Sequence, residues 1–211
     1  MLRNRIVAWD DFVTEASEPL GGRELPSGQT WTLATSDAGG QGWQGDADVF
    51  EGRVGTGFGA WIPAALDIGE AEAWVGTADA STAAYGGLIL GISDNQADAL
   101  GLGVAADGRS RLRTIIAGTA ANAFSPGNPN GAYANGSIVH LRVRWDTTGR
   151  ISWWVDGTFA ATHQVTDSAL LTVLGQRIGI GGRFLQVVRG FAVRNLTDAD
   201  IIESFWVGGG D

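Results

Sequence analysis

Residues 139–163 read VHLRVRWDTTGRISWWVDGTFAATH, and this stretch decides the fold class. Apolar residues occupy every second position of 139–145, with polar residues between them, which is the period of a strand with one buried face. After a polar turn the alternation resumes over 151–155. Asp156-Gly157 then predicts a two-residue hairpin turn into a third strand. The stretch therefore predicts an antiparallel meander of three strands.

Similar short strands, separated by turn residues, are predicted along the rest of the chain. They fall at 29–35, 48–54, 58–62, 70–76, 88–92, 100–104, 109–114, 178–181 and 187–194. About twelve strands of this kind are typical of a sandwich or jelly roll. Residues 117–137 are predicted to form a long loop. Short helical segments are expected at 167–174 and after Asn195. We therefore predict an all-β, two-sheet antiparallel jelly-roll sandwich with little helix.

Composition narrows the classes of function. The chain has 211 residues, a net charge of −9 and no cysteine. The negative charge argues against a nucleic-acid partner, because phosphate binding needs a basic surface. Disulfides and Cys–zinc sites are excluded. The N-terminus lacks the apolar run of a signal peptide, and no stretch approaches the roughly 20 apolar residues of a membrane span. We expect a protein that is made in a cytoplasm and is not inserted into a membrane.

With its neighbouring strands, the meander resembles the laminin-G-like domains of the concanavalin A-like lectin/glucanase superfamily. The residues that carry this resemblance are 136–162 with the Val155-Asp156-Gly157 hairpin, 87–90, 178–184, 191–193, and the opening Asp10-Asp11-Phe12, Gly21 and 27–31. The opening is similar to versions of the domain in bacteriophage structural proteins. The resemblance covers 9–196 and implies a jelly roll over 1–196, followed by a C-terminal extension, 197–211.

No catalytic centre is predicted. Glycosidases of this fold need paired carboxylates, about 5–5.5 Å apart for a retaining mechanism, and the superfamily's E-x-D-x-x-E run is missing. Glu70 and Glu72 come closest, and we interpret them as a solvated strand face. His140 and His163 occupy ordinary strand positions without a nucleophile motif. We therefore expect a protein that is not an enzyme.

No resident cofactor is expected, with calcium kept as an alternative. The superfamily often holds Ca²⁺ at the rim of the sandwich through oxygen ligands. Two turns offer such oxygens, one with Asp94, Asn95 and Asp98 and one with Asp46 and Asp48. Asp and Asn also form ordinary turns, so the pattern by itself does not predict a metal site.

Sugar binding would use exposed aromatic rings, with polar side chains beside them for the hydroxyl groups. The candidate residues are Trp43, Asn128, Asn130, Tyr133 and Trp154. Trp154 lies on the polar side of its strand, whereas the other tryptophans of the meander are expected in the core. The alternative for Trp43 and Tyr133 is that each ring packs beneath its own loop.

Five arginines form a possible stripe on two strands. Arg109, Arg111, Arg113, Arg142 and Arg144 alternate outward, and the two strands are expected to be near neighbours. One reading is a site for an acidic glycan or an acidic partner. The other is a set of cross-strand pairs with Asp and Glu on a wet sheet face.

An apolar group follows the end of the family resemblance. Ile201, Ile202, Phe205 and Trp206 are expected to dock either on their own domain or on a neighbouring subunit, as an assembly contact. Together with the phage-like opening, this favours a non-enzymatic structural protein of a bacteriophage virion. It would be a head decoration, fibre or tail subunit whose partners are itself, as a homo-oligomer, other virion proteins and possibly a cell-surface glycan. The alternative is a bacterial glycan-binding module, and the least favoured is a glycoside hydrolase.

Overall fold

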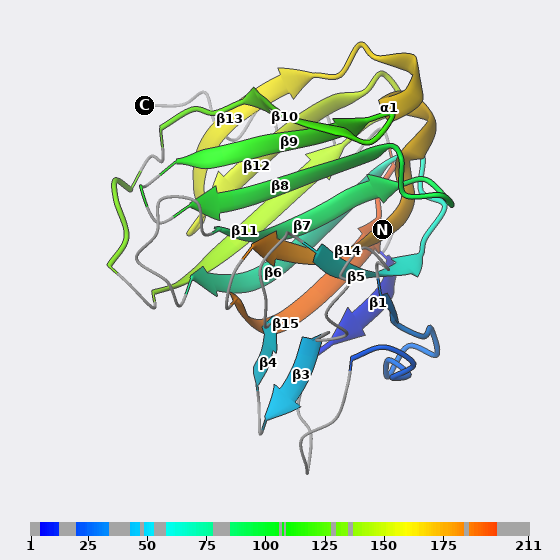
Figure 1. The fold of residues 1–211 in the computed structure, drawn as a ribbon, viewed down its shortest axis with the longest axis vertical. Coiled ribbons are helices and arrows are strands. Elements are labelled where there is room, and N and C mark those ends of the chain that lie inside the picture. The colour runs from blue at the N-terminus through cyan, green and yellow to red at the C-terminus, as the bar shows by residue number, and fades with distance from the viewer. Residues whose placement is uncertain are drawn as a thin grey trace.

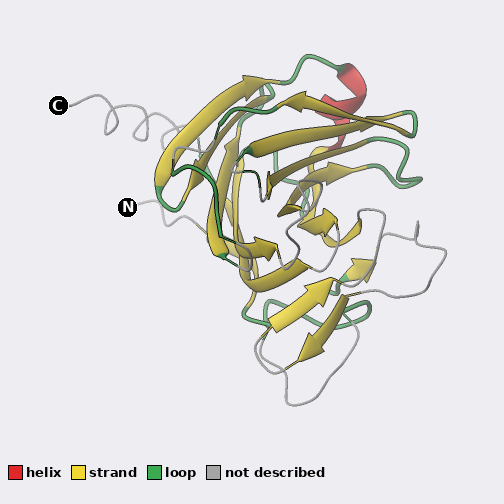
Figure 2. Cartoon of the chain, turned by 60° about the vertical axis from the view of Figure 1, so that its left-hand side comes forward, coloured by secondary structure: helices red, strands yellow, loops and turns green. Residues whose placement is uncertain are grey.

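Two antiparallel sheets face each other across one hydrophobic core in the computed structural model (Figure 1). The structure describes residues 5–12, 20–33, 43–46, 49–52, 58–77, 85–105, 107, 109–127, 130–134, 137–183 and 186–197. These residues form fifteen strands and one short helix, so the predicted all-β class is confirmed (Figure 2).

The eight-stranded sheet is built around the predicted meander. Its order is β13 (Thr158–Gln164), β12 (Arg150–Val155), β11 (Ile138–Trp145), β6 (Gly69–Thr77), β15 (Gln186–Asn195), β4 (Val49–Gly52) and β3 (Trp43–Asp46), with β1 (Arg5–Asp10) paired to β15. The β12–β13 turn has positive φ angles at Asp156 (49°) and Gly157 (78°), as a type I′ hairpin requires. The predicted meander is therefore confirmed.

The seven-stranded sheet covers the other side of the core. Its order is β10 (Thr119–Phe124), β9 (Ser110–Ile116), β8 (Ala99–Ala105), β7 (Tyr85–Ile92), β14 (Leu174–Arg183), β5 (Phe58–Pro63) and β2 (Thr32–Leu33). Helix α1 (Ser168–Val173) confirms the short helical segment predicted at 167–174, and its N-cap Asp167 accepts hydrogen bonds from two backbone N–H groups. None of the helices among the described residues is long and apolar enough to cross a membrane.

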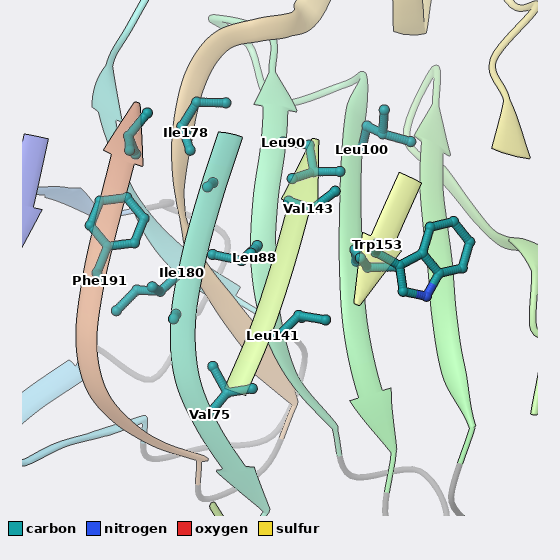
Figure 3. Packing of buried hydrophobic residues seen from close by; sticks show 14 of the residues in the cluster. Val75, Leu88, Leu90, Leu100, Leu141, Val143, Trp153, Ile178, Ile180 and Phe191 are labelled. Atoms are coloured by element: carbon teal, nitrogen blue, oxygen red, sulfur yellow. The ribbon is translucent and has the colours of Figure 1, made fainter. Parts of the chain in front are cut away.

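Alternate residues of facing strands fill the core (Figure 3). Trp145 and Trp153 are fully buried, as predicted from their phase in the meander. Both of these indole N–H groups are satisfied: Trp145 donates to the carbonyl of Leu66 at 3.1 Å, and Trp153 donates to the Oγ of Ser110 at 3.0 Å. The second bond joins the two sheets, since Ser110 begins β9.

Close strand contact explains one of the interior glycines. A Cβ added to Gly87 would stand 2.1 Å from the carbonyl oxygen of Leu102 and 2.5 Å from the Cα of Gly103 on the paired strand β8. Only a residue without a side chain permits this approach.

The strand prediction missed β1, β3 and β10. The β10 strand lies inside the predicted loop 117–137, so that prediction was wrong for 119–124. All six of its residues are exposed, because β10 is the edge of its sheet and adds no buried face. Its sequence therefore lacks the alternation by which strands were recognised. The helical segment expected after Asn195 lies outside the described residues.

A buried carboxylate ties the N-terminal strand to the core. Asp10 accepts hydrogen bonds from the backbone N–H of Phe12 (2.8 Å), the indole of Trp31 (2.7 Å) and the guanidinium of Arg23 (3.0 Å). The Trp31 ring stacks on Phe12 and lies 5.0 Å from the ring of Phe191. Asp10, Phe12 and Trp31, which belong to the opening of the family resemblance, thus form one buried cluster with Phe191.

Candidate functional site

The outward surface of the eight-stranded sheet, called here the outer face, carries aromatic and charged side chains in register. One row across the sheet runs from Trp154 to Arg142, Glu72, Ala192 and Trp9, each residue opposite the next on the neighbouring strand. Residues directly opposite each other in an antiparallel pair share a face. The row therefore spans five strands, from β12 to β1.

An ionic cluster occupies the centre of the outer face. Glu70 accepts hydrogen bonds from Arg144 at 2.5 Å and from Arg194 at 3.1 Å. Glu72 accepts from Arg194 at 2.5 Å and lies 3.1 Å from the Nε2 of His140. The Glu70 side chain is only 7% exposed, so the predicted solvated strand face was wrong. The glutamates are shielded because long side chains from both neighbouring strands close over them.

The cluster favours the charged forms of Glu72 and Arg194. Burial by itself would raise the pKa of Glu72, but the hydrogen bond and charge of Arg194, with His140, outweigh burial and lower the pKa below its ordinary value of 4.5. Burial would likewise lower the pKa of Arg194, and its bonds to Glu72 and Glu70 raise it instead. This arrangement suits recognition, because the charges and their directions are set before a ligand arrives.

Two tryptophans stand exposed on the outer face, on either side of strand β15. Trp74 is 42% exposed and Trp9 is 40% exposed. Between their strands, β15 presents Gly190 and Ala192, and a Cβ at Gly190 would touch the Trp74 ring at 3.3 Å. We call these four residues the tryptophan platform. Two strand spacings, about 9–10 Å, separate the backbones that carry the two rings.

The Trp74 ring is supported on its other side. It stacks on the imidazole of His140, with ring centroids 4.3 Å apart and planes 21° apart. Sequence analysis missed Trp74 and Trp9 as site residues. A signal for Trp74 existed, because it follows Glu70 and Glu72 at the same two-residue spacing and therefore shares their polar side of the strand.

Trp154 belongs to the outer face, as its phase predicted, but its ring is partly covered. The guanidinium carbons of Arg142 and Arg144 lie 4.6 Å and 5.4 Å from the ring centroid. Phe159, which is 53% exposed, contacts the indole edge-on at 5.8 Å. Trp154 thus supports the arginines, and Trp74 offers the more open aromatic surface.

Two other predicted sugar-binding residues lie beside the β12–β13 turn. Asn130 donates to the carbonyl of Val155 at 3.1 Å, and the hydroxyl of Tyr133 lies 3.4 Å from the carboxylate of Asp156. Tyr133 is partly buried and packs against the core. Both residues therefore lie at the end of the sheet that carries Trp154. Their binding roles stay predictions.

The remaining predicted residues fall where the structure gives no side-chain detail. Trp43 begins β3, but its side chain lies outside the described residues, as does all of Asn128. The same holds for the predicted assembly residues, which are Ile201, Ile202, Phe205 and Trp206.

The predicted five-arginine stripe is wrong. Arg109, Arg111 and Arg113 lie at or in β9 of the seven-stranded sheet, whereas Arg142 and Arg144 lie in β11 of the eight-stranded sheet. The two groups therefore belong to opposite layers of the sandwich. The alternation of residues indicates that the arginines of each group point outward, but it does not indicate to which sheet each strand belongs. Cross-strand pairing with acidic residues is confirmed for Arg144.

The oxygen-rich turn considered for calcium is used internally. Asp94 pairs with Arg177, Asn95 accepts from the backbone N–H of Ala97, and Asp98 accepts from the backbone N–H of Ala117. The second candidate turn, with Asp46 and Asp48, has no described side chains. Within the described ranges, no group of three or more acidic or histidine side chains is arranged to hold a metal.

Comparison with known proteins identifies the fold. No family model matches the chain, and no curated protein sequence does. Among solved structures, the carbohydrate-binding module CBM66 from Bacillus subtilis is 16% identical, with a TM-score of 0.56 over 78% of this chain and 91% of that one. The carbohydrate recognition domain of Emp47p is 13% identical, with a TM-score of 0.56 over 90% and 98%. β-Agarase A from Zobellia galactanivorans is 12% identical, with a TM-score of 0.58 over 89% and 90%. The chain therefore has a lectin-like jelly-roll fold.

Proposed function

We propose that the chain is a non-catalytic carbohydrate-binding domain that holds its ligand on the outer face of the eight-stranded sheet. The observation that carries this proposal is Trp74, a 42% exposed ring held against His140 in the centre of a polar face. A large exposed aromatic side chain that is fixed in place indicates a binding role, because burying it would be favourable.

The tryptophan platform suits a sugar ring. The C–H-rich side of a pyranose stacks on an aromatic face, and its hydroxyl groups need donors and acceptors around the edge. Glu72 and Arg194 lie beside the platform and supply both kinds of group. Between Trp74 and Trp9, β15 presents Gly190 and Ala192, neither of which carries a side chain larger than a methyl group.

The glutamates of the outer face favour binding over hydrolysis. A glycosidase acid must hold a proton near neutral pH, which requires a raised pKa. The pKa of Glu72 is lowered, and Glu70 is bound by two arginines. Both carboxylates are thus committed to ion pairs. The structural neighbours include both binding domains and enzymes, among them an agarase, a GH43 protein and a sialidase, so their names do not decide between these roles.

Titration of glycan binding tests the proposal. A glycan array identifies a ligand, and calorimetry then compares the wild type with Trp74→Ala and Ala192→Leu. We expect each variant to lose about tenfold or more in affinity, equivalent to about 1.4 kcal/mol, because one removes the ring and the other fills the space beside it. The control is Ile116→Ala, which removes an exposed apolar side chain from the opposite sheet. An array without any bound glycan, or unchanged affinity in Trp74→Ala, would overturn the proposal.

A structural role in a bacteriophage virion is the second candidate. It is supported by the resemblance of the opening residues to phage structural proteins. The predicted partners are further copies of the chain and other virion proteins. Light scattering after size exclusion should show a stable oligomer, and capsid or tail genes should flank the coding sequence. A monomer encoded away from such genes would contradict this role.

A further inference from the structure

Arg142 on the outer face has no acidic partner among the described residues. Arg144 and Arg194 bind the two glutamates of the ionic cluster. Arg142 lies directly opposite Glu72 in register, yet the Glu72 carboxylate is taken by Arg194 and His140. Within the described part of the chain, the contact of the Arg142 guanidinium is the Trp154 ring, 4.6 Å away.

This contact prepares Arg142 to bind an anion. A guanidinium over an indole is held by the charge–ring attraction, and its N–H groups can still donate hydrogen bonds. Holding a long side chain in place reduces the conformational entropy that binding would otherwise cost. Guanidinium groups bind carboxylates through two parallel hydrogen bonds and also match sulfate and phosphate oxygens.

The local charge also favours an anion. The chain as a whole carries a net charge of −9. On this sheet, however, the four arginines of β11 and β15, which are Arg142, Arg144, Arg189 and Arg194, outnumber the two glutamates of β6. Arg144, whose guanidinium carbon is 5.4 Å from the same Trp154 ring, places a second cation beside Arg142.

Arg142 lies within one sugar unit of the tryptophan platform. His140 is directly opposite Trp74 across the β11–β6 pair, so Arg142, two residues on, is a diagonal neighbour of Trp74. Such neighbours are about 7–8 Å apart. A sugar stacked on Trp74 can therefore direct a charged substituent, its own or that of the next unit, toward Arg142.

We propose that the outer face selects glycans that carry a negatively charged group, a carboxylate or a sulfate, and that Arg142 on Trp154 binds this group. The inference rests on the proposed function, because it needs a sugar on the same face. The proposed carbohydrate-binding surface is then specific for acidic glycans.

A glycan array with neutral, uronic-acid, sialylated and sulfated members gives the first test. We expect the bound members to be acidic, and the array distinguishes carboxylate from sulfate. The best acidic glycan and its neutral counterpart, carboxyl-reduced or desulfated, are then titrated against the wild type, Arg142→Gln and Arg109→Gln. The last variant is the control, because it removes the same charge from an exposed position on the opposite sheet.

The wild type should bind the acidic form at least about tenfold more tightly than the neutral form. Arg142→Gln should remove this preference and leave the weaker neutral binding unchanged, whereas Arg109→Gln should keep it. Higher salt should weaken acidic binding and spare neutral binding, a test that needs no variant. Equal affinities of the wild type for both forms, or equal losses for both in Arg142→Gln, would overturn the inference and leave the proposed function standing. A blank array would overturn both.

Discussion

Removing the Asp10 carboxylate should strongly destabilise the domain. Its side chain is fully buried and accepts from Trp31, Phe12 and Arg23 at 2.7, 2.8 and 3.0 Å. In Asp10→Ala, a buried indole N–H and a buried backbone N–H lose their acceptor, at about 1–3 kcal/mol each. The cation of Arg23, only 12% exposed, loses its carboxylate as well. Because neighbouring losses are not additive, we expect a total of about 3–5 kcal/mol.

Urea denaturation followed by tryptophan fluorescence measures this loss. The matched control is Asp67→Ala, which removes the same charge from an exposed position and should change stability by less than about 0.5 kcal/mol. For a chain of this length, the loss in Asp10→Ala corresponds to a fall in Tm of about 6–20 °C. If Asp10→Ala were no less stable than Asp67→Ala, the reasoning that this carboxylate holds the N-terminal strand in place would be wrong.

Three further predictions concern the outer face and the core. The folded-state pKa of Glu72 lies below 4.5, so its bond to Arg194 should make the wild type more stable than Glu72→Gln at pH 7. This difference in stability should shrink as the pH falls below about 4.5, because the carboxylate becomes protonated. Urea denaturation of both proteins at several pH values measures it. Gly87→Ala should lower the Tm by several degrees, since the new Cβ would meet a backbone carbonyl oxygen at 2.1 Å; an unchanged melting curve would refute the close approach. Ser110→Ala should cost about 1–3 kcal/mol by leaving the indole N–H of Trp153 without an acceptor, and Ser110→Thr, which keeps the hydroxyl, should cost less if the hydrogen bond is the cause.

The outer face shows how cross-strand register combines residues that are distant in the sequence. The two tryptophans of the platform come from β1 and β6, and the small residues between them come from β15. The same alternation that buries one side of each strand aligns these residues on the other side. A candidate binding surface of this kind needs no loop to form it.

The amino-acid sequence by itself determined the strand class, the central meander and the burial of Trp145 and Trp153. These features are local, because alternation and a hairpin turn express themselves over a few neighbouring residues. The sequence also placed Arg142 and Trp154 on the outward side of their strands, which the structure confirms.

Only the tertiary structure decided which strands lie side by side. It separated the arginines of β9 from those of β11, and it brought Glu70 and Glu72 under Arg194, more than 120 positions away. The order of strands in each sheet depends on long-range packing between the two layers. The alternation of residues within one strand does not identify the strands that pair with it. For that reason the polar face of each strand was predictable, whereas the partners that make it a candidate site were not.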